Sequence, residues 1–311
     1  MTIKSKILIT GSSGFIGSNL HSSFHLDFKL FGLDIAKSGP FPLESVYGWD
    51  ELEKLPMVDT IIHLAGKAHD TSNTIDSASY FEINLGLTKR IFDYFLQSNA
   101  TKFIFFSSVK AVADTVGNEI LTEDVIPNPK TPYGQSKLAA EKYILSQQLP
   151  VGKKFYILRP CMIHGPGNKG NLNLLYKFVR KGIPWPLGSF ENNRSFVSIG
   201  NLIFVLRLLI EKDIPSGTYN IADDESFSTN QLIRLIAESV QRKPIIWNIP
   251  APIIRFIAKS GDLFHLPLNS ERLKKLTESY VVSNTKLKSA LKINTLPISV
   301  YDGLSFTLKH L

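Results

Sequence analysis

Residues 6–17 read KILITGSSGFIG, a short apolar run followed by glycines at positions 11, 14 and 17. The run is typical of a buried β-strand, and the residues that follow Gly17 suit a helix. Dinucleotide binding requires this order of strand, glycine-rich turn and helix, because glycines let the backbone approach a pyrophosphate at the helix N-terminus. The sequence therefore predicts a dinucleotide at Gly11, Gly14 and Gly17, with GxxGxxG spacing.

The next apolar run, residues 29–33, ends in Asp34. A carboxylate about twenty residues past the glycine loop can accept hydrogen bonds from the adenosine ribose hydroxyls, and it would repel a 2′-phosphate. This favours NAD over NADP, although Lys37 could soften the repulsion and leaves NADP open. The alternative interpretation of Asp34 is an ordinary turn residue at a strand end.

Predicted strands and helices alternate through the first half of the chain. The strands are expected at residues 58–66, 102–108 and 154–159, and the helices at 77–97 and from 132 onward. This order indicates an α/β fold with a doubly wound parallel sheet, Rossmann-like in architecture. The strand ending in Leu64, Ala65 and Gly66 permits close approach of a cofactor. Ser108 ends the next strand, at the sheet edge where ligands bind.

Regular alternation stops after Gly167, which predicts a smaller mixed C-terminal substrate lobe. We assign residues 1–165 and 200–223 to an NAD(P)-binding domain, and residues 166–199 and 224–311 to a nucleotide-sugar-binding lobe. The cleft between the lobes is then the expected substrate site.

The stretch Thr131-Pro132-Tyr133-Gly134-Gln135-Ser136-Lys137 reads as a helix start, with Thr131 as N-cap. Tyr133 and Lys137 lie four apart, so their side chains share one helix face. A nearby ammonium favours the phenolate, and we expect it to lower the pKa of Tyr133 for general acid/base work. The alternative is a surface Tyr–Lys pair on an amphipathic helix.

Composition narrows the class of protein. The net charge of +8 comes without a dominant Lys/Arg run, which favours a small anionic substrate over nucleic acid. Cys161 is the only cysteine, so no intrachain disulfide can form. No apolar stretch reaches bilayer-spanning length, no signal-peptide core is evident, and no metal-ligand cluster stands out. We therefore expect a cytoplasmic protein with no membrane insertion and no metal.

In series, these motifs resemble the extended short-chain dehydrogenase/reductases, specifically the NAD-dependent epimerase/dehydratase family acting on nucleotide sugars. They occur in family order and span nearly the whole chain. The matching pieces are TGSSGFIG at 10–17, Asp34, HLAG at 63–66, Asn84, FFSS at 105–108, YGQSK at 133–137, RPCMIHGPG at 159–167 and RSFV at 194–197.

The resemblance implies a catalytic triad of Ser108, Tyr133 and Lys137. Tyr133 would exchange a proton with a sugar hydroxyl or ketone, Ser108 would hydrogen-bond the reacting oxygen, and Lys137 would bind the nicotinamide ribose. The cofactor-binding residues implied in this way are Gly11, Gly14, Phe15, Ile16, Gly17, Asp34, Leu64, Ala65, Gly66, Tyr133 and Lys137.

For the substrate, the resemblance implies a UDP-sugar whose diphosphate contacts Asn171 and Arg194, with Arg272 as a second phosphate contact. An arginine fork matches two phosphate oxygens at once. The family also implies a homodimer through the helices near 77–97 and 132–148.

The residues after Ser108 depart from one branch of the family. Sugar 4,6-dehydratases carry an Asp-Glu pair there for water loss, whereas this chain has Val109 and Lys110. We therefore reject a dehydratase. The pattern resembles UDP-hexose 4-epimerases and reductases of UDP-4-keto-6-deoxy-N-acetylhexosamines. Asp34 favours the NAD-recycling epimerase, and the Ser108-Val109-Lys110 pattern favours the reductase; we choose the epimerase. A non-catalytic NAD(P)-binding sensor or RNA-binding protein is the third alternative, which the presence of the whole triad disfavours.

Overall fold

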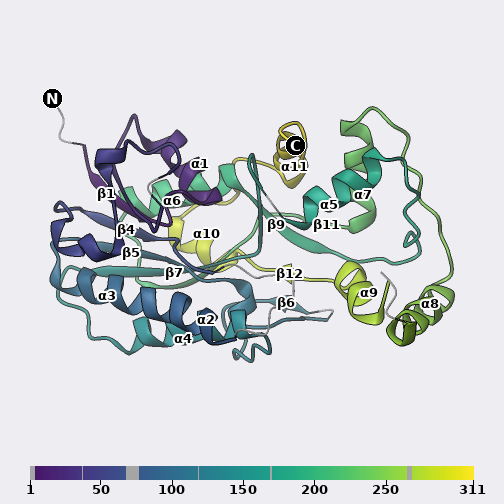
Figure 1. Cartoon of the computed structure of the whole chain (residues 1–311), viewed down its shortest axis with the longest axis horizontal. Coiled ribbons are helices and arrows are strands. Elements are labelled where there is room, and N and C mark those ends of the chain that lie inside the picture. The colour runs from purple at the N-terminus through teal and green to yellow at the C-terminus, as the bar shows by residue number, and fades with distance from the viewer. Residues whose placement is uncertain (1–3, 37, 68–76, 118, 169, 265–267) are drawn as a thin grey trace.

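A seven-stranded parallel sheet forms the centre of the computed structural model, which describes residues 4–36, 38–67, 77–117, 119–168, 170–264 and 268–311 (Figure 1). In spatial order the strands are β10 (Gly217–Ile221), β7 (Lys154–Pro160), β5 (Lys102–Phe106), β4 (Thr60–His63), β1 (Lys6–Thr10), β2 (Lys29–Leu33) and β3 (Val46–Tyr47). Strand order reverses between β4 and β1. Doubly wound sheets bind their ligands beyond the carboxyl ends of the strands at such a reversal.

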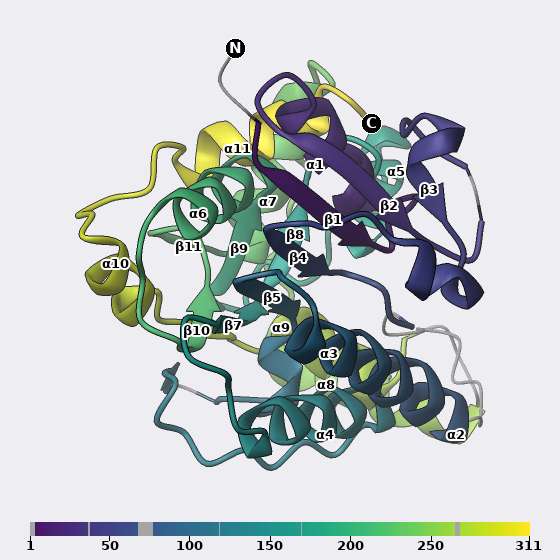
Figure 2. The same cartoon turned by 90° about the vertical axis from the view of Figure 1, so that its left-hand side faces the viewer.

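Helices cover both faces of this sheet because its strands are apolar on both sides (Figure 2). Ile7 and Ile9 point into the core under α1 (Phe15–Phe24), α6 (Ile199–Glu211) and α10 (Thr285–Leu291). Leu8 points into the opposite core. That second core lies under α3 (Leu87–Gln97) and α4 (Pro132–Ser146). The predicted Rossmann-like α/β fold is confirmed.

The predicted helix over 77–97 has an irregular first half. It consists of α2 (Ser77–Tyr80), a π-helical segment (Phe81–Gly86) and then α3. π-Helical turns are rare and occur frequently at functional sites. Here the widened segment carries the buried side chain of Asn84.

A smaller lobe with its own apolar core follows the large sheet. Its mixed three-stranded sheet pairs β8 (Met162–His164) in parallel with β9 (Arg194–Ser198), and β9 antiparallel with β11 (Ser226–Phe227). The helices around it are α5 (Asn171–Arg180), α7 (Thr229–Ser239), α8 (Ala251–Phe264), α9 (Ser270–Thr277) and α11 (Val300–Leu308). The remaining short elements are the pair β6 (Ile120–Leu121) and β12 (Val281–Val282), and the 3-10 turns Leu43–Ser45, Trp49–Lys54 and Val109–Ala111.

The lobes share chain segments. Leu287 and Leu291 of α10 come late in the sequence, yet they pack in the core of the large sheet. The division of the chain into 1–165 with 200–223, and 166–199 with 224–311, stays a prediction. Among the described residues, no helix has the length and apolar character needed to cross a membrane.

Candidate active site

The glycine-rich loop between β1 and α1 is packed so closely that a Cβ does not fit at Gly11 or at Gly17. Gly11 has φ +69°, and a Cβ there would lie 2.8 Å from the main-chain nitrogen of Ala65. A Cβ at Gly17 would lie 2.6 Å from the main-chain oxygens of Gly11 and Ser12. Gly14, whose Cβ would lie 3.2 Å from the oxygen of Gly11, is the N-cap of α1. The loop thus presents bare backbone at a helix N-terminus, which fits the pyrophosphate of a dinucleotide.

Phe15 and Ile16 open α1 and pack, partly buried, against the core beneath that helix. Leu64 and Ala65 lie across from the glycine loop. Their main-chain nitrogens donate to the main-chain and side-chain oxygens of Thr10, at 3.2 Å and 3.0 Å. The predicted cofactor-binding residues of β1, α1 and β4 therefore lie together at the point where strand order reverses.

Asp34 lies directly after β2, buried, and is hydrogen-bonded to the glycine loop. Its Oδ2 accepts from the Ser13 main-chain nitrogen at 2.9 Å and from the Ser13 hydroxyl at 2.7 Å, and its Oδ1 accepts from the Ile35 nitrogen at 2.8 Å. These bonds keep a carboxylate beside the loop. That position suits recognition of an adenosine ribose and opposes a 2′-phosphate.

Ser108 and Tyr133 form a hydrogen bond with each other at the carboxyl end of the sheet. Ser108 is the N-cap of the turn after β5, where its Oγ accepts from the Lys110 nitrogen at 3.1 Å. Tyr133 lies in the first turn of α4, which Thr131 caps by accepting from the Gly134 nitrogen at 3.3 Å. Its ring makes an edge contact with Tyr80, with centroids 6.2 Å apart.

Lys137 is buried one turn after Tyr133. Its Nζ donates to the Phe106 main-chain oxygen at 2.8 Å, and a Cβ at Gly66 would lie 3.2 Å from the same nitrogen. Burial lowers the pKa of Lys137 to about 8, against the opposing effect of Glu141. The structure thus brings Ser108, Tyr133 and Lys137 next to the cofactor loop of β4.

The predicted lowering of the Tyr133 pKa is wrong for this structure. Burial raises the pKa of Tyr133, the hydrogen bond with Ser108 lowers it, and Tyr80 raises it. The physical reason is that desolvation of the phenol outweighs stabilisation of the phenolate. Lys137, expected to supply that stabilisation, directs its ammonium to the oxygen of Phe106.

A buried network of hydrogen bonds connects β1, β4 and the π-helical segment next to the site. No sequence pattern indicated this network. His63 Nδ1 lies 2.7 Å from the Thr10 hydroxyl and Nε2 lies 2.9 Å from the Thr88 hydroxyl. Burial, and then the charge of Lys137, hold the pKa of His63 well below its ordinary value, so the ring is neutral. Because Thr88 donates to the Asn84 main-chain oxygen at 2.6 Å, it accepts from His63 Nε2. β1, β4 and the π-helical segment are fixed together by this network.

Asn84 is one of the residues that carry the resemblance to the family. It connects the hydrogen-bond network of His63 to α4, the helix that carries Tyr133. Its Nδ2 donates to the Ser136 hydroxyl at 2.9 Å, and its Oδ1 accepts from the Lys67 nitrogen at 2.8 Å. The Ser136 hydroxyl in turn donates to the Tyr133 main-chain oxygen at 2.8 Å. Asn84 therefore helps to orient the helix turn that carries Tyr133.

A buried ion pair was also missed from the sequence. Glu141 accepts from Arg159 Nε at 2.9 Å and from Nη2 at 2.6 Å, and Glu141 also accepts from the Ser107 hydroxyl. Tyr133, Lys137 and Glu141 recur every four residues and so share one face of α4. An arginine in a buried strand needs a carboxylate partner, which was the available signal.

Arg194, at the start of β9, is held near the loop that follows Ser108. It donates to the main-chain oxygens of Glu278, at 3.2 Å, and Lys275. Burial lowers the Arg194 pKa and Glu278 opposes that shift. Glu278 also acts on Lys110, whose pKa is lowered by burial and whose Nζ lies 4.2 Å from the ring centroid of Tyr280. The predicted phosphate-binding arginine and the Ser108 loop thus meet across one charged cluster.

The two other predicted substrate residues lie on helices of the smaller lobe. Asn171 is the first residue of α5, and its side chain lies outside the described part of the structure. Arg272 lies exposed in the first turn of α9, where its main-chain nitrogen donates to Asn269 Oδ1 at 2.8 Å. α9 is also the helix whose Lys275 oxygen binds Arg194. Arg194 and Arg272 are therefore placed on contacting elements.

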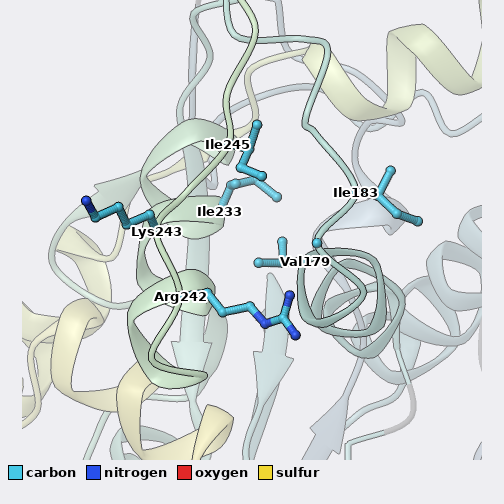
Figure 3. A pocket seen from close by; sticks show the side chains of 7 residues that line it. Val179, Ile183, Ile233, Arg242, Lys243 and Ile245 are labelled. Atoms are coloured by element: carbon cyan, nitrogen blue, oxygen red, sulfur yellow. The ribbon is translucent and has the colours of Figure 1, made fainter.

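One cavity of about 280 Å³ lies elsewhere, between the end of α5, α7 and the segment after α7 (Figure 3). Apolar side chains converge on it, and Arg242 reaches across it toward α5. Its lining residues are Val179, Gly182, Ile183, Ile233, Arg242, Lys243 and Ile245. None of them is a predicted site residue, so this cavity is separate from the Tyr133 site.

A family model described as the NAD dependent epimerase/dehydratase family matches residues 7–222, from β1 to the residue after β10. The chain belongs to this family. The dinucleotide cradle and the Ser108–Tyr133–Lys137 cluster both lie inside the matched range. The chain is an NAD(P)-dependent nucleotide-sugar enzyme, and membership of an NAD-dependent family confirms the cofactor predicted from the sequence.

Relatives within the family include two epimerases and a reductase. UDP-glucose 4-epimerase from Vibrio cholerae is 32% identical over 262 residues, which cover 79% of this chain and 79% of that protein. The 4-epimerase of N-acetyl-α-D-glucosaminyl-diphospho-ditrans,octacis-undecaprenol from Escherichia coli O157:H7 is 25% identical over 319 residues, 98% of this chain and 94% of that protein. GDP-6-deoxy-D-mannose reductase from Pseudomonas aeruginosa is 25% identical over 263 residues, 80% and 85% of the two chains.

Among solved structures, UDP-glucose 4-epimerase from Thermus thermophilus in complex with NAD superposes with a TM-score of 0.74. It is 23% identical, and the match covers 98% of each chain. This likeness shows that the two proteins share one fold over both lobes.

Proposed function

We propose that this chain is an NAD-dependent 4-epimerase that uses hydride transfer at C4 of a UDP-hexose or UDP-N-acetylhexosamine. The observation that carries the proposal is the cluster of Tyr133, Ser108 and Lys137, which lies beside a loop whose first and third glycines have no room for a Cβ. A proton carrier and a dinucleotide cradle on one sheet edge suit the oxidation and reduction of a sugar alcohol.

Each residue of the cluster has a separate task. Tyr133 takes the proton of the C4 hydroxyl as C4 is oxidised and gives a proton back when C4 is reduced. Ser108, hydrogen-bonded to Tyr133, donates to the reacting oxygen. Lys137, fixed by the Phe106 oxygen, supplies positive charge beside the ribose site. NAD held at the glycine loop would supply the chemistry of hydride removal from C4 and hydride return to the opposite face of the sugar.

The charged cluster of Arg194 with the end of α9 is our proposed diphosphate site, with Asn171 and Arg272 as further contacts. The guanidinium fork fits the oxygens of a diphosphate that links the sugar to a nucleoside. The substrates in the names of the two similar epimerases differ in the group that the diphosphate joins to the sugar. One name contains a uridine diphosphate and the other a polyprenol diphosphate. We propose uridine, because the relative named for a UDP-sugar is 32% identical and the one named for a polyprenol is 25% identical.

A reductase of a UDP-4-keto-6-deoxy-N-acetylhexosamine is the alternative, and the observation that favours it is Lys110. This side chain lies where a dehydratase carries an acid, and its Nζ donates to the Asp114 main-chain oxygen at 2.7 Å. Such a site keeps hydride transfer without elimination. Asp34, bound to Ser13, still opposes NADP and so supports internal recycling of NAD.

The test begins with the cofactor that the purified protein retains, identified by mass spectrometry after denaturation. The protein is then incubated without added cofactor with UDP-glucose, UDP-N-acetylglucosamine or a polyprenol-diphosphate N-acetylglucosamine, and the products are resolved by NMR. Retained NAD with inversion at C4 of a UDP-sugar supports the proposal. Turnover only of a 4-keto sugar with added NAD(P)H supports the reductase, and inversion only of the polyprenol substrate replaces uridine by lipid.

We further propose a homodimer through the helices spanning 77–97 and 132–146, acting in the cytoplasm on precursors of surface polysaccharide or glycan. The single cysteine gives no support to an oxidising compartment. Phe81 and Leu145 are 37% and 53% exposed on these helices, so both are available to a second copy.

A further inference from the structure

The outward side of α8 is apolar. Isolated apolar residues are normal on protein surfaces, whereas a contiguous group of them indicates a binding surface. Their exposed fractions are 51% for Ile253, 72% for Phe256, 42% for Ile257, 73% for Leu263 and 68% for Phe264. We call these five residues the α8 face.

Packing on the other side of the helix fixes this orientation. Ile254, Ala258 and Gly261 are buried, and they recur with the spacing of one helix stripe. A Cβ at Gly261 would lie 1.9 Å from the Leu268 main-chain oxygen, so the helix backbone is in direct contact with the chain beneath it. The α8 face therefore cannot turn inward by a simple rotation of the helix.

Two basic side chains of α8 lie beside the α8 face. Arg255 and Lys259 are exposed on α8 itself, beside the apolar side chains. The one acid on this helix, Asp262, accepts hydrogen bonds from the main-chain nitrogen and hydroxyl of Ser270, and the whole chain has a net charge of +8. Just before the helix, Trp247 is 53% exposed and Ile245 is 47% exposed. An aromatic ring and basic side chains around an exposed apolar helix face are typical of helices that lie in a membrane interface.

The position of α8 leaves the face accessible. In Figure 1, α8 lies at the outer end of the smaller lobe, away from the large sheet and its helices. The helix has 14 residues, whereas crossing the hydrocarbon core takes about 20. A helix of this length can therefore bind a membrane only by lying along its surface.

We propose that the α8 face binds the surface of an anionic lipid bilayer, with Phe256, Leu263 and Phe264 entering the interface and Arg255 and Lys259 meeting the headgroups. The inference does not depend on the proposed epimerase reaction. A second copy of the chain fits less well, since stable protein interfaces use about 20–30 residues a side. Two such faces would also bring like-charged flanks together, whereas anionic headgroups complement them.

Vesicle flotation with the full-length protein tests this inference. The vesicles are phosphatidylcholine alone and a two-to-one mixture of phosphatidylcholine and phosphatidylglycerol. We expect binding to the mixture, weaker binding at high salt, and little binding to phosphatidylcholine alone. Replacing Phe256→Ser with Leu263→Ser should weaken binding about tenfold or more, because the apolar area that enters the interface is lost. Arg255→Gln with Lys259→Gln should reduce the salt dependence.

Ile126→Ser is the matched control, since Ile126 is 86% exposed on a loop of the large domain. It should bind as the unchanged protein does, and circular dichroism should show that every variant keeps its helices. Binding to neither vesicle, or binding that the Phe256→Ser and Leu263→Ser variant retains in full, would overturn the proposal. So would a molecular mass that falls when these two residues are replaced, which would assign the α8 face to a second copy.

Discussion

Lys137 Nζ donates a 2.8 Å hydrogen bond to the main-chain oxygen of Phe106, which joins α4 to the carboxyl end of β5. The lysine is 5% exposed, and burial lowers its pKa to about 8. Keeping this lysine protonated in the folded protein therefore costs free energy, because burial removes the ammonium from water. The hydrogen bond orients the ammonium toward the cofactor side, and the penalty lowers the stability of the cofactor-free fold.

Replacing Lys137→Met should stabilise the cofactor-free protein at neutral pH. Below about pH 8 the lysine is protonated in both folded and unfolded chains, so the whole penalty is present. From pH 8 to its ordinary pKa of 10.5 the folded chain loses the proton first, and the penalty falls as pH rises. We expect an advantage for the variant on the order of 2 kcal/mol near pH 7 that closes toward high pH.

Urea unfolding of both proteins across that pH range measures this difference, because other titrating groups cancel between them. Activity should be lost in the variant at every pH. Parallel stability curves for the two proteins would show that Lys137 does not titrate with a lowered pKa.

Tyr133→Phe should reduce turnover by about a hundredfold or more, since removal of the proton carrier leaves binding groups in place. The fold should be unchanged because the ring and its edge contact with Tyr80 remain. Tyr143→Phe is the matched control on the same helix. Tyr143 donates to Asp93 Oδ1 at 2.5 Å on the protein surface, far along α4 from the site. Equal turnover of the two variants would remove Tyr133 from the reaction.

Gly17→Ala should abolish tight NAD binding, since the added Cβ would lie 2.6 Å from two main-chain oxygens of the glycine loop. Relief requires the loop itself to move, so we expect at least a roughly tenfold loss of affinity by calorimetry. Gly86→Ala is the control. Among the described residues, no heavy atom beyond the neighbouring backbone of its own helix lies within 4 Å of a Cβ at Gly86, and its φ of −61° is helical. That variant should bind NAD normally and gain up to about 1 kcal/mol of stability.

Local patterns in the sequence predict the parts of this site that depend on neighbouring residues. Strand β1, the glycine loop and α1 follow from one short continuous segment, and Tyr133 and Lys137 lie on one helix face as their spacing requires. Asp34 stands at the end of β2, beside the glycine loop. Each of these depends on backbone geometry that a short segment sets by itself.

Contacts between segments that are distant in the chain could not be predicted from the sequence. The pKa of Tyr133 moves up because of burial, which requires knowledge of what covers the ring. Arg194 binds oxygens of residues 275 and 278, more than eighty positions away. His63 is fixed by hydroxyls from β1 and α3. Only the assembled sheet and lobes bring these partners together.

The proposed dimer predicts a molecular mass twice that of the chain, measured by light scattering after gel filtration. Leu145→Glu should lower this mass, because a buried charge opposes an apolar helix contact. Leu26→Glu, at a residue 71% exposed after α1, should leave the mass unchanged. A monomeric mass for the unchanged protein at the assay concentration would end the proposal.

The buried pair of Glu141 and Arg159 predicts an asymmetry between single and double variants. Their side chains are 1% and 6% exposed, and removal of either partner leaves an uncompensated charge in the core. Glu141→Leu or Arg159→Met alone should therefore destabilise the fold by about 3–5 kcal/mol. The double variant should be more stable than either single one, since apolar side chains then replace both charges. Urea unfolding of the four proteins gives the coupling energy. Additive losses would mean that the two residues stabilise the fold independently of each other.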